Sequence, residues 1–301
     1  MDEFRYRAPA RSFFGEEAWA VGLAQEARAI VIPFPLEATV SFGEGTARGP
    51  DAIIAASAAL EAFDEELRCS PIRSFGLATL ETPMIARPLD AALDQIENLA
   101  GAALSRERFP LILGGEHSLT IAAVRAFAAR HSELAILHFD AHADLRDSYR
   151  GERLGHACVM RRVLEHQHLN LVSVGVRSIS QGEMAFLNAR SDRISVHWAK
   201  NRTAWDLNEI VRPLAGKPIY LSFDVDAFDA SLMPATGTPE PGGLFFDDAC
   251  AIIRAAAEAG TIVGADVVEL TPIPGMTACD VTAAKLAYKI LSYALGRNGA
   301  G

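Results

Sequence analysis

Short apolar runs rich in Val and Ile recur along the chain and predict buried strands. Each run is apolar throughout instead of alternating with polar residues, which is typical of strands in a parallel sheet that is covered on both faces. The runs lie at residues 29–32, 111–113, 135–139, 171–176, 194–197, 219–225 and 261–270.

Segments with apolar residues at helical spacing lie between these runs and predict helices. They cover residues 50–67, 90–106, 118–130, 246–259 and 283–295. The alternation of strands and helices indicates βαβ units, and no linker-like stretch divides the chain. We therefore expect an α/β fold with three αβα layers and a mainly parallel sheet, in a single domain over residues 1–301. Ligands of such sheets bind beyond the carboxyl ends of the strands.

Composition and charge restrict the partners. The chain has 28 Lys and Arg against 38 Asp and Glu, a net charge of −10, and no basic run that would predict nucleic-acid binding. We expect no membrane partner either, because no apolar stretch is long enough to span a bilayer. The four cysteines are scattered and no secretory signal is recognisable, so we expect a cytoplasmic protein.

Polar side chains with metal-binding chemistry follow three of the predicted strands. Asp140, His142 and Asp144 alternate after the run at 135–139, so in extended backbone they would share one face. Asp224 and Asp226 repeat this spacing at the end of the run at 219–225. The run at 111–113 leads through two glycines, which allow a sharp turn, to His117 before a helix.

These side chains together favour a site for two metal ions. A single Asp-x-His at a strand end is more often solvated, but acids and imidazoles gathered from three strand ends would repel one another without a cation. Four carboxylates and two histidines are too many for one tetrahedral zinc, and no thiolate accompanies them. We expect two Mn²⁺ ions per chain, sharing carboxylates and activating a water molecule.

Further polar residues are candidates for contacts with a substrate. Glu269 lies near the end of the last predicted strand and could hold a planar guanidinium through paired hydrogen bonds. His156 follows a polar loop that would overhang the site, and it could transfer protons. The segment 234–243, which includes Thr236, is rich in turn-forming residues and is expected to form a rigid loop near the metals.

Five motifs in order resemble the ureohydrolase family of arginases and agmatinases. They are Gly-Gly-Glu-His-Ser at 114–118, Asp-Ala-His-Ala-Asp at 140–144, Ser-Phe-Asp-Val-Asp-Ala-Phe-Asp at 222–229, Thr-Gly-Thr-Pro at 236–239 and Val-Glu-Leu-Thr-Pro at 268–272. The resemblance covers most of the chain and implies an arginase-like fold. It also implies an enzyme that hydrolyses a guanidino compound to urea and an amine, usually as a homo-oligomeric trimer or hexamer.

The resemblance also implies roles for individual residues. One manganese ion would be bound by His117, Asp140, Asp144 and Asp224, and the other by Asp140, His142, Asp224 and Asp226. Asp140 would thus bridge the ions and serve catalysis directly. Glu269 would orient the guanidinium, His156 would carry the proton to the departing amine, and Thr236 would contact the substrate.

Within the family the chain is most similar to the short agmatinases of bacteria and archaea, which makes agmatine the expected substrate. Three residues depart from that pattern. Gly155 replaces a serine that is common before the histidine, and Arg150 and Arg153 add positive charge to a loop that could meet the substrate tail. Inward-pointing arginines would attract a carboxylate, so guanidinobutyrate or another guanidino acid is an alternative. Arginase activity is less favoured.

Two functions of other classes remain open. The fold of single-zinc deacetylases resembles that of arginases, but one ion needs fewer than six ligands. A metal-binding subunit without catalysis, which regulates a partner, is the second alternative. Metal stoichiometry and urea release would distinguish them.

Overall fold

Eight parallel strands form one sheet in the computed structural model, which describes residues 4–19 and 24–296. The strand order is β2-β1-β3-β8-β7-β4-β5-β6. The strands are β1 (Ala29–Phe34), β2 (Leu77–Thr79), β3 (Phe109–Gly114), β4 (Ala135–Phe139), β5 (Asn170–Val174), β6 (Ile194–His197), β7 (Pro218–Asp224) and β8 (Thr261–Val268).

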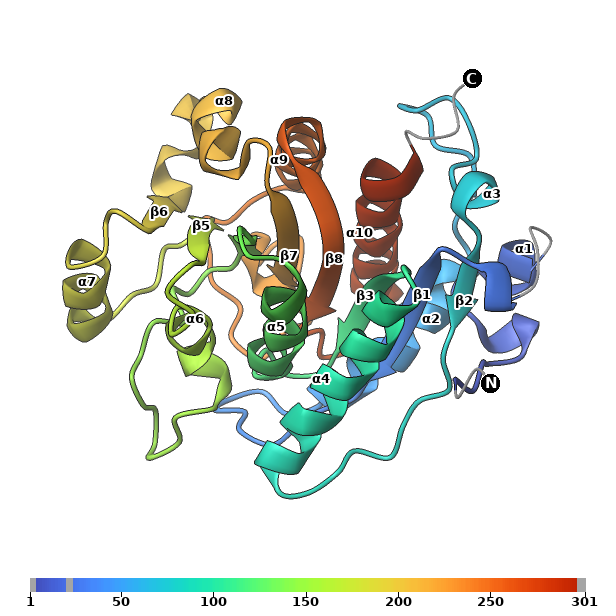
Figure 1. The fold of residues 1–301 in the computed structure, drawn as a ribbon, viewed down its shortest axis with the longest axis horizontal. Coiled ribbons are helices and arrows are strands. Elements are labelled where there is room, and N and C mark those ends of the chain that lie inside the picture. Colours follow the sequence, from blue (N-terminus) through green and yellow to red (C-terminus); the bar gives the residue numbers. More distant parts are fainter. Residues whose placement is uncertain (1–3, 20–23, 297–301) are drawn as a thin grey trace.

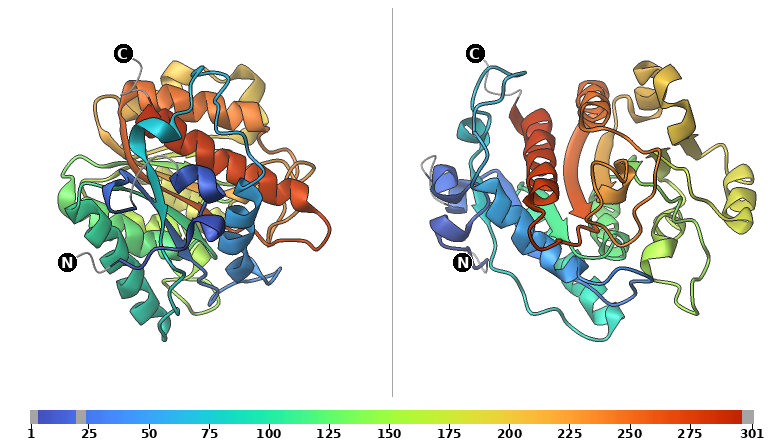
Figure 2. Two further views of the ribbon diagram at one scale, coloured as in Figure 1. Left: turned by 90° about the vertical axis from the view of Figure 1, so that its right-hand side faces the viewer. Right: turned by 180° about the vertical axis from the view of Figure 1, so that it is seen from behind.

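Helices cover both faces of the sheet, which confirms the three-layer αβα prediction. In Figure 1 the helices α4 (Leu89–Ser105), α5 (Leu119–Arg130) and α6 (Val159–Val163) lie in front of the sheet. The view from behind in Figure 2 brings α2 (Gly49–Ser57) and α10 (Thr277–Leu295) forward, and α9 (Phe246–Ala259) packs beside α10. Shorter helices are α1 (Gly15–Trp19), α3 (Ile72–Phe75), α7 (Gln181–Asn188) and α8 (Leu207–Val211).

Both faces of the central strands are buried, as their continuous apolar sequences predicted. In β4, Leu137 and Phe139 pack into the core beneath α2, α9 and α10, whereas Ile136 packs into the core beneath α4 and α5. The two cores are therefore built from alternate residues of the same strands.

The structure differs from the predicted elements at several places, among them β2 and the helix that begins at Gly49. Strand β2 was not predicted, because three residues are too short to give a recognisable pattern. The helix predicted at 50–67 ends at Ser57. The residues beyond it turn toward α10, where the buried Lys289 amine lies 3.0 Å from Asp64 and 3.1 Å from Glu65.

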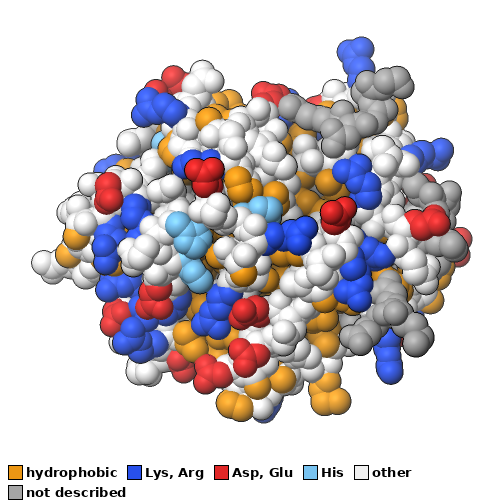
Figure 3. Space-filling model, in the orientation of Figure 1, with side chains coloured by type: hydrophobic (Ala, Val, Ile, Leu, Met, Phe, Trp, Pro, Cys, Tyr) orange, Lys and Arg blue, Asp and Glu red, His pale blue; other side chains and the backbone are white. Residues whose placement is uncertain are grey.

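Among the described residues, none of the helices combines the length and the apolar character that a bilayer crossing requires. On the face shown in Figure 3, basic and acidic side chains are interspersed over α5, α6 and their neighbours.

The carboxyl ends of the strands meet two long loops. The segment around residue 40, which follows β1, and the segment around residue 150, which follows β4, lie at the same end of the molecule in both Figure 1 and Figure 2. This end of the sheet is where the sequence predicted the polar site.

Candidate functional site

Three strand ends bring His117 into contact with three carboxylates. Its Nδ1 lies 3.1 Å from an oxygen of Asp144, 3.3 Å from Asp140 and 3.5 Å from Asp224. His117 follows β3, Asp140 follows β4 and Asp224 ends β7, and β7 and β4 are adjacent in the sheet. All four side chains are buried.

A second cluster forms beside the first. The Nδ1 of His142 lies 2.9 Å from Asp226 and 3.4 Å from Asp140. Asp140 therefore belongs to both clusters, with Oδ2 toward His117 and Oδ1 toward His142. The six residues that the sequence nominated as metal ligands thus lie together, with Asp140 in contact with both histidines.

The backbone that gathers these side chains is not the extended strand that the sequence predicted. Strand β4 ends at Phe139, and Asp144 takes a left-handed backbone conformation with φ of 51°. Asp226 lies in a short 3-10 helix, Val225–Ala227. Glu269 is also left-handed, with φ of 67°. A non-glycine residue in this region is strained, and such strain is often found at functional sites.

The glycines before His117 serve close packing instead of an unusual turn. Neither Gly114 nor Gly115 has a positive φ. A Cβ atom on Gly115 would lie 2.0 Å from the carbonyl oxygen of Leu36, so only glycine allows the loop after β1 to approach β3. This approach brings the loop that contains Thr39 to the site.

Two carboxylates of the clusters, Asp224 and Asp226, resist ionisation in the metal-free protein. Burial raises the pKa of Asp224 well above its ordinary range, and the charges of Asp226 and Asp140 add to this effect. Burial, with the charge of Asp140, also raises the pKa of Asp226. Several carboxylates that resist ionisation together become stable as anions when divalent cations lie between them.

The hydrogen bonding of His117 shows that the site fits a metal ion. Its Nε2 lies 2.9 Å from Ser222 Oγ, whereas Nδ1 is buried without a hydrogen-bond partner although it faces the carboxylates. Ser222 donates in turn to Asp266, at 2.7 Å. Because Asp266 engages the hydroxyl proton, Ser222 accepts the proton on Nε2, and Nδ1 is the ring nitrogen that faces the carboxylates and can bind a cation.

Two residues that support the clusters were not predicted from the sequence. Asp266 is fully buried in β8 and also accepts hydrogen bonds from Tyr220 and Thr120. His138 lies between Asp140 and Ser173, at 2.9 Å and 3.0 Å, and so supports the shared carboxylate. The sequence signal that could have identified both residues is a charged or imidazole side chain inside an apolar strand, because such a side chain is rarely buried without a partner.

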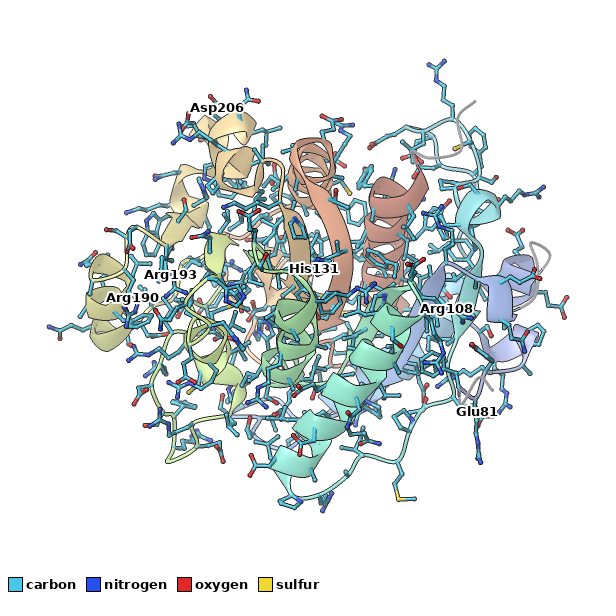
Figure 4. All side chains as sticks on the ribbon, viewed as in Figure 1. Glu81, Arg108, His131, Arg190, Arg193 and Asp206 are labelled. Carbon is cyan, nitrogen blue, oxygen red and sulfur yellow. The ribbon has the colours of Figure 1, made fainter. Side chains whose placement is uncertain are left out.

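The clusters line a cavity of about 290 Å³ together with the other candidates. Glu269 and His156 both contribute to its wall. From the 236–239 loop, Gly237 and Thr238 line the cavity, whereas Thr236 is buried and pairs with Leu270. Among the described residues, the histidines of the cavity are His117, His142 and His156. His131, labelled in Figure 4, lies instead at the end of α5.

The arginines of the loop after Asp144 take different positions. Arg153 is exposed and pairs with Asp147 and Glu165, at 3.5 Å and 3.9 Å. Arg150 is exposed too, and its guanidinium lies 5.4 Å from the centre of the Tyr149 ring. Within the described part of the chain, Arg146 is the arginine that lines the cavity. Its Nε lies 3.8 Å from Glu183.

Comparisons with known proteins agree with this geometry. Residues 27–293 match the model of the arginase family. The chain is 35% identical to the N(1)-aminopropylagmatine ureohydrolase of Synechocystis sp., over 92% of each chain. It is 33% identical to the agmatinase of Bacillus cereus, over 83% of this chain and 85% of the relative.

A solved structure shows the same fold. The agmatine ureohydrolase of Thermoplasma volcanium superposes with a TM-score of 0.84 at 29% identity, covering 96% of this chain and 95% of that one. The resemblance predicted from the sequence motifs is therefore confirmed. The chain belongs to the arginase family.

Proposed function

We propose that the chain hydrolyses a guanidino compound to urea and an amine, with two Mn²⁺ ions. The observation that carries this proposal is that Asp140 is shared between the two clusters, 3.3 Å from His117 Nδ1 and 3.4 Å from His142 Nδ1. A carboxylate in that position can bridge two cations, and a bridged pair of cations is suited to hydrolysis.

Each ion would have its own ligands within the clusters. His117, Asp140, Asp144 and Asp224 would bind the first ion, and Asp140, His142, Asp224 and Asp226 the second. Carboxylate and imidazole ligands without thiolates favour Mn²⁺. When bound, such ions lower the pKa of water and stabilise the negative charge that develops during hydrolysis.

Glu269 would hold the guanidinium. Its Oε1 accepts the backbone N–H of His117 at 2.7 Å, which orients the carboxylate and leaves Oε2 and the second lone pair of Oε1 for the substrate. Burial, followed by the charge of Glu116, raises the pKa of Glu269 to about 8. A guanidinium beside it would therefore stabilise its charged form, and a planar carboxylate matches a planar guanidinium through paired hydrogen bonds.

His156 would protonate the departing amine. It lines the same cavity as Glu269, and the edge of its ring meets the ring of Tyr149, with centroids 5.9 Å apart. As the C–N bond breaks, the amine nitrogen needs a proton, which an imidazolium can donate. The imidazole that remains is reprotonated from solvent before the next cycle.

Agmatine is the substrate that we propose, with putrescine and urea as products. The agmatinase of Bacillus cereus is similar over most of both chains. The arginines that would attract a carboxylate tail, Arg150 and Arg153, are exposed and engaged elsewhere. The charge of Arg146 is offset by the nearby Glu183. Guanidinobutyrate would need Arg146 to leave Glu183 and turn to the substrate.

N(1)-aminopropylagmatine is a second candidate. The relative from Synechocystis sp. that bears this name matches 92% of each chain. Phe42 lines the cavity and is 78% exposed, so a longer amine tail could continue to the surface beside it. The longer amine therefore needs no rearrangement of the metal clusters.

Urea release after Mn²⁺ loading tests the proposal. Agmatine, N(1)-aminopropylagmatine, arginine and guanidinobutyrate would be compared, and we expect the highest kcat/KM with agmatine. A preference for the aminopropyl compound would support the second candidate, and a preference for guanidinobutyrate would assign Arg146 to the substrate tail. If no compound releases urea, the proposed function is wrong.

Metal counting separates the remaining alternatives. We expect two Mn²⁺ per chain. One zinc ion per chain with amide hydrolysis would support a deacetylase, and Mn²⁺ binding without urea release would support a regulatory subunit. We also propose that the protein is a cytoplasmic homo-oligomer, a trimer or a hexamer. Light scattering would measure the size of the assembly.

A further inference from the structure

A chain of hydrogen bonds connects a buried carboxylate to His156 through Thr39. The Thr39 hydroxyl lies 2.8 Å from Glu116 Oε1. It also lies 3.2 Å from the Nδ1 of His156 and accepts the backbone N–H of His156 at 3.1 Å. Thr39 therefore contacts both the backbone and the ring of the residue to which we assigned proton transfer.

Glu116 determines the direction of these hydrogen bonds. It is fully buried and accepts the backbone N–H groups of Ala38 and Thr39 and the hydroxyl of Ser118. A carboxylate is an acceptor, so the Thr39 hydroxyl donates its proton to Glu116. Its oxygen is then left to accept, and the Nδ1 of His156 must carry the donated hydrogen.

We propose that Thr39 is a positioning residue that fixes the neutral imidazole of His156 in the Nδ1–H form. This inference rests on the proposed function of His156. With Nδ1–H held by Thr39, Nε2 is the atom that exchanges the proton. The imidazolium gives its Nε2 proton to the amine nitrogen as the C–N bond breaks, and a neutral ring with hydrogen on Nδ1 remains.

Gly155 provides the space for this contact. A Cβ atom at residue 155 would lie 3.2 Å from Thr39 Oγ1 and 3.3 Å from Glu152 Cγ, which is tighter than ordinary packing. The glycine that departs from the agmatinase pattern therefore allows Thr39 to approach the backbone of His156 without adjustment.

The hydroxyl can be removed without releasing the loop. Glu116 accepts the backbone N–H of Thr39 at 2.6 Å as well as its hydroxyl, and that backbone contact remains in Thr39→Val. Thr39→Ser keeps the hydroxyl and should keep the function.

The same loop offers a matched control. Thr46 is buried and donates its hydroxyl to Glu37 at 3.2 Å, and Glu37 also accepts the backbone N–H groups of Gly45 and Ala47. Thr46→Val therefore removes the same kind of hydrogen bond without a contact to His156. A general loss of loop order would affect both variants.

The first measurement compares kcat, KM and metal content in the Mn²⁺-loaded enzyme. We expect Thr39→Val to lower kcat about 10- to 100-fold, with KM and bound metal little changed. Thr39→Ser and Thr46→Val should stay close to the unaltered enzyme. Equal losses in Thr39→Val and Thr46→Val, or an unchanged kcat in Thr39→Val, would overturn the inference.

The second measurement reads the tautomer directly and does not depend on activity. In the metal-free protein with ¹⁵N-labelled histidine, the ring signals of His156 are identified by their loss in His156→Asn. In the neutral form of the His156 ring we expect hydrogen on Nδ1, and a shift toward Nε2–H in Thr39→Val. Hydrogen on Nε2 in the unaltered protein would contradict the inference, even if urea release is confirmed. If urea release fails but Nδ1–H is found, the proposed function alone is wrong.

Discussion

Ser222 Oγ lies 2.9 Å from the Nε2 of His117 and donates its own hydrogen bond to Asp266, so a buried carboxylate orients this imidazole from outside the cavity. The sheet sets this contact, because Ser222 of β7 and Asp266 of β8 are register partners. Residues that orient a metal-binding histidine usually strengthen metal binding.

Ser222→Ala should therefore weaken metal binding. We expect the affinity for the Mn²⁺ ion that His117 would bind to fall about 10- to 100-fold, because the His117 ring loses the partner that fixes Nε2–H. Calorimetric titration with Mn²⁺ measures this. Thr120→Val removes a different hydrogen bond to Asp266 and serves as the control, with unchanged affinity. Equal affinities in Ser222→Ala and the unaltered protein would contradict the assignment.

Asp140→Asn should abolish turnover and reduce the metal content. Asp140 contacts both His117 and His142, so its loss affects both proposed ion sites together. The amide keeps the shape but supplies neither the charge nor two acceptor oxygens. Metal analysis after dialysis, alongside urea release, checks this. Near-normal activity would refute the bridging role of Asp140.

His156→Asn should lower kcat and leave the metal content intact. General acid catalysis contributes about 10²- to 10⁴-fold to a rate, so we expect a loss in that range. His156 contacts Thr39 and Tyr149, and it lines the cavity without belonging to either metal cluster. A loss of bound Mn²⁺ in this variant would make His156 a ligand instead.

Metal affinity should rise with pH because binding displaces protons. In the metal-free protein burial lowers the pKa of His142, but the charge of Asp226 and the hydrogen bond to Asp140 outweigh it and raise the pKa to about 12. Protonated His142 therefore stabilises the metal-free fold fully at a pH below its pKa in the unfolded chain. This stabilisation is lost as the pH rises through its pKa in the folded protein. At neutral pH the ring is thus protonated, and Mn²⁺ must release that proton. Titrations in buffers of different ionisation enthalpy measure the release, and an affinity independent of pH would contradict it.

Lys289→Met should destabilise the fold. The Lys289 amine lies 3.0 Å from Asp64, and both side chains are buried, so the substitution leaves a buried carboxylate without its cation. Losing one partner of such a pair costs about 3–5 kcal/mol of unfolding free energy. Arg212→Ala breaks an exposed pair with Glu209 and should cost about 0–1 kcal/mol. Denaturant unfolding compares the free energies of unfolding of the two variants. Similar losses would contradict the prediction that Lys289→Met leaves a buried carboxylate without compensation.

The residue types and their order along the chain were sufficient to predict the parallel sheet, both helical layers and the six candidate ligands. Continuous apolar runs report burial on both faces of a strand, and polar residues just after such runs report the carboxyl edge where ligands bind. His117, Asp140 and Asp224 could be nominated in this way because each follows a different buried strand.

The contacts between distant segments were decided by the tertiary structure alone. The partnership of Ser222 with Asp266, and of His138 with Ser173, depends on strand register, and a shift of one residue would turn each side chain to the opposite face. The approach of Thr39 to His156 depends on how two loops meet beyond the sheet. Periodicity along a sequence predicts local conformation and burial. The two residues of each pair are separated by long connecting segments, and periodicity does not predict how those segments pack together.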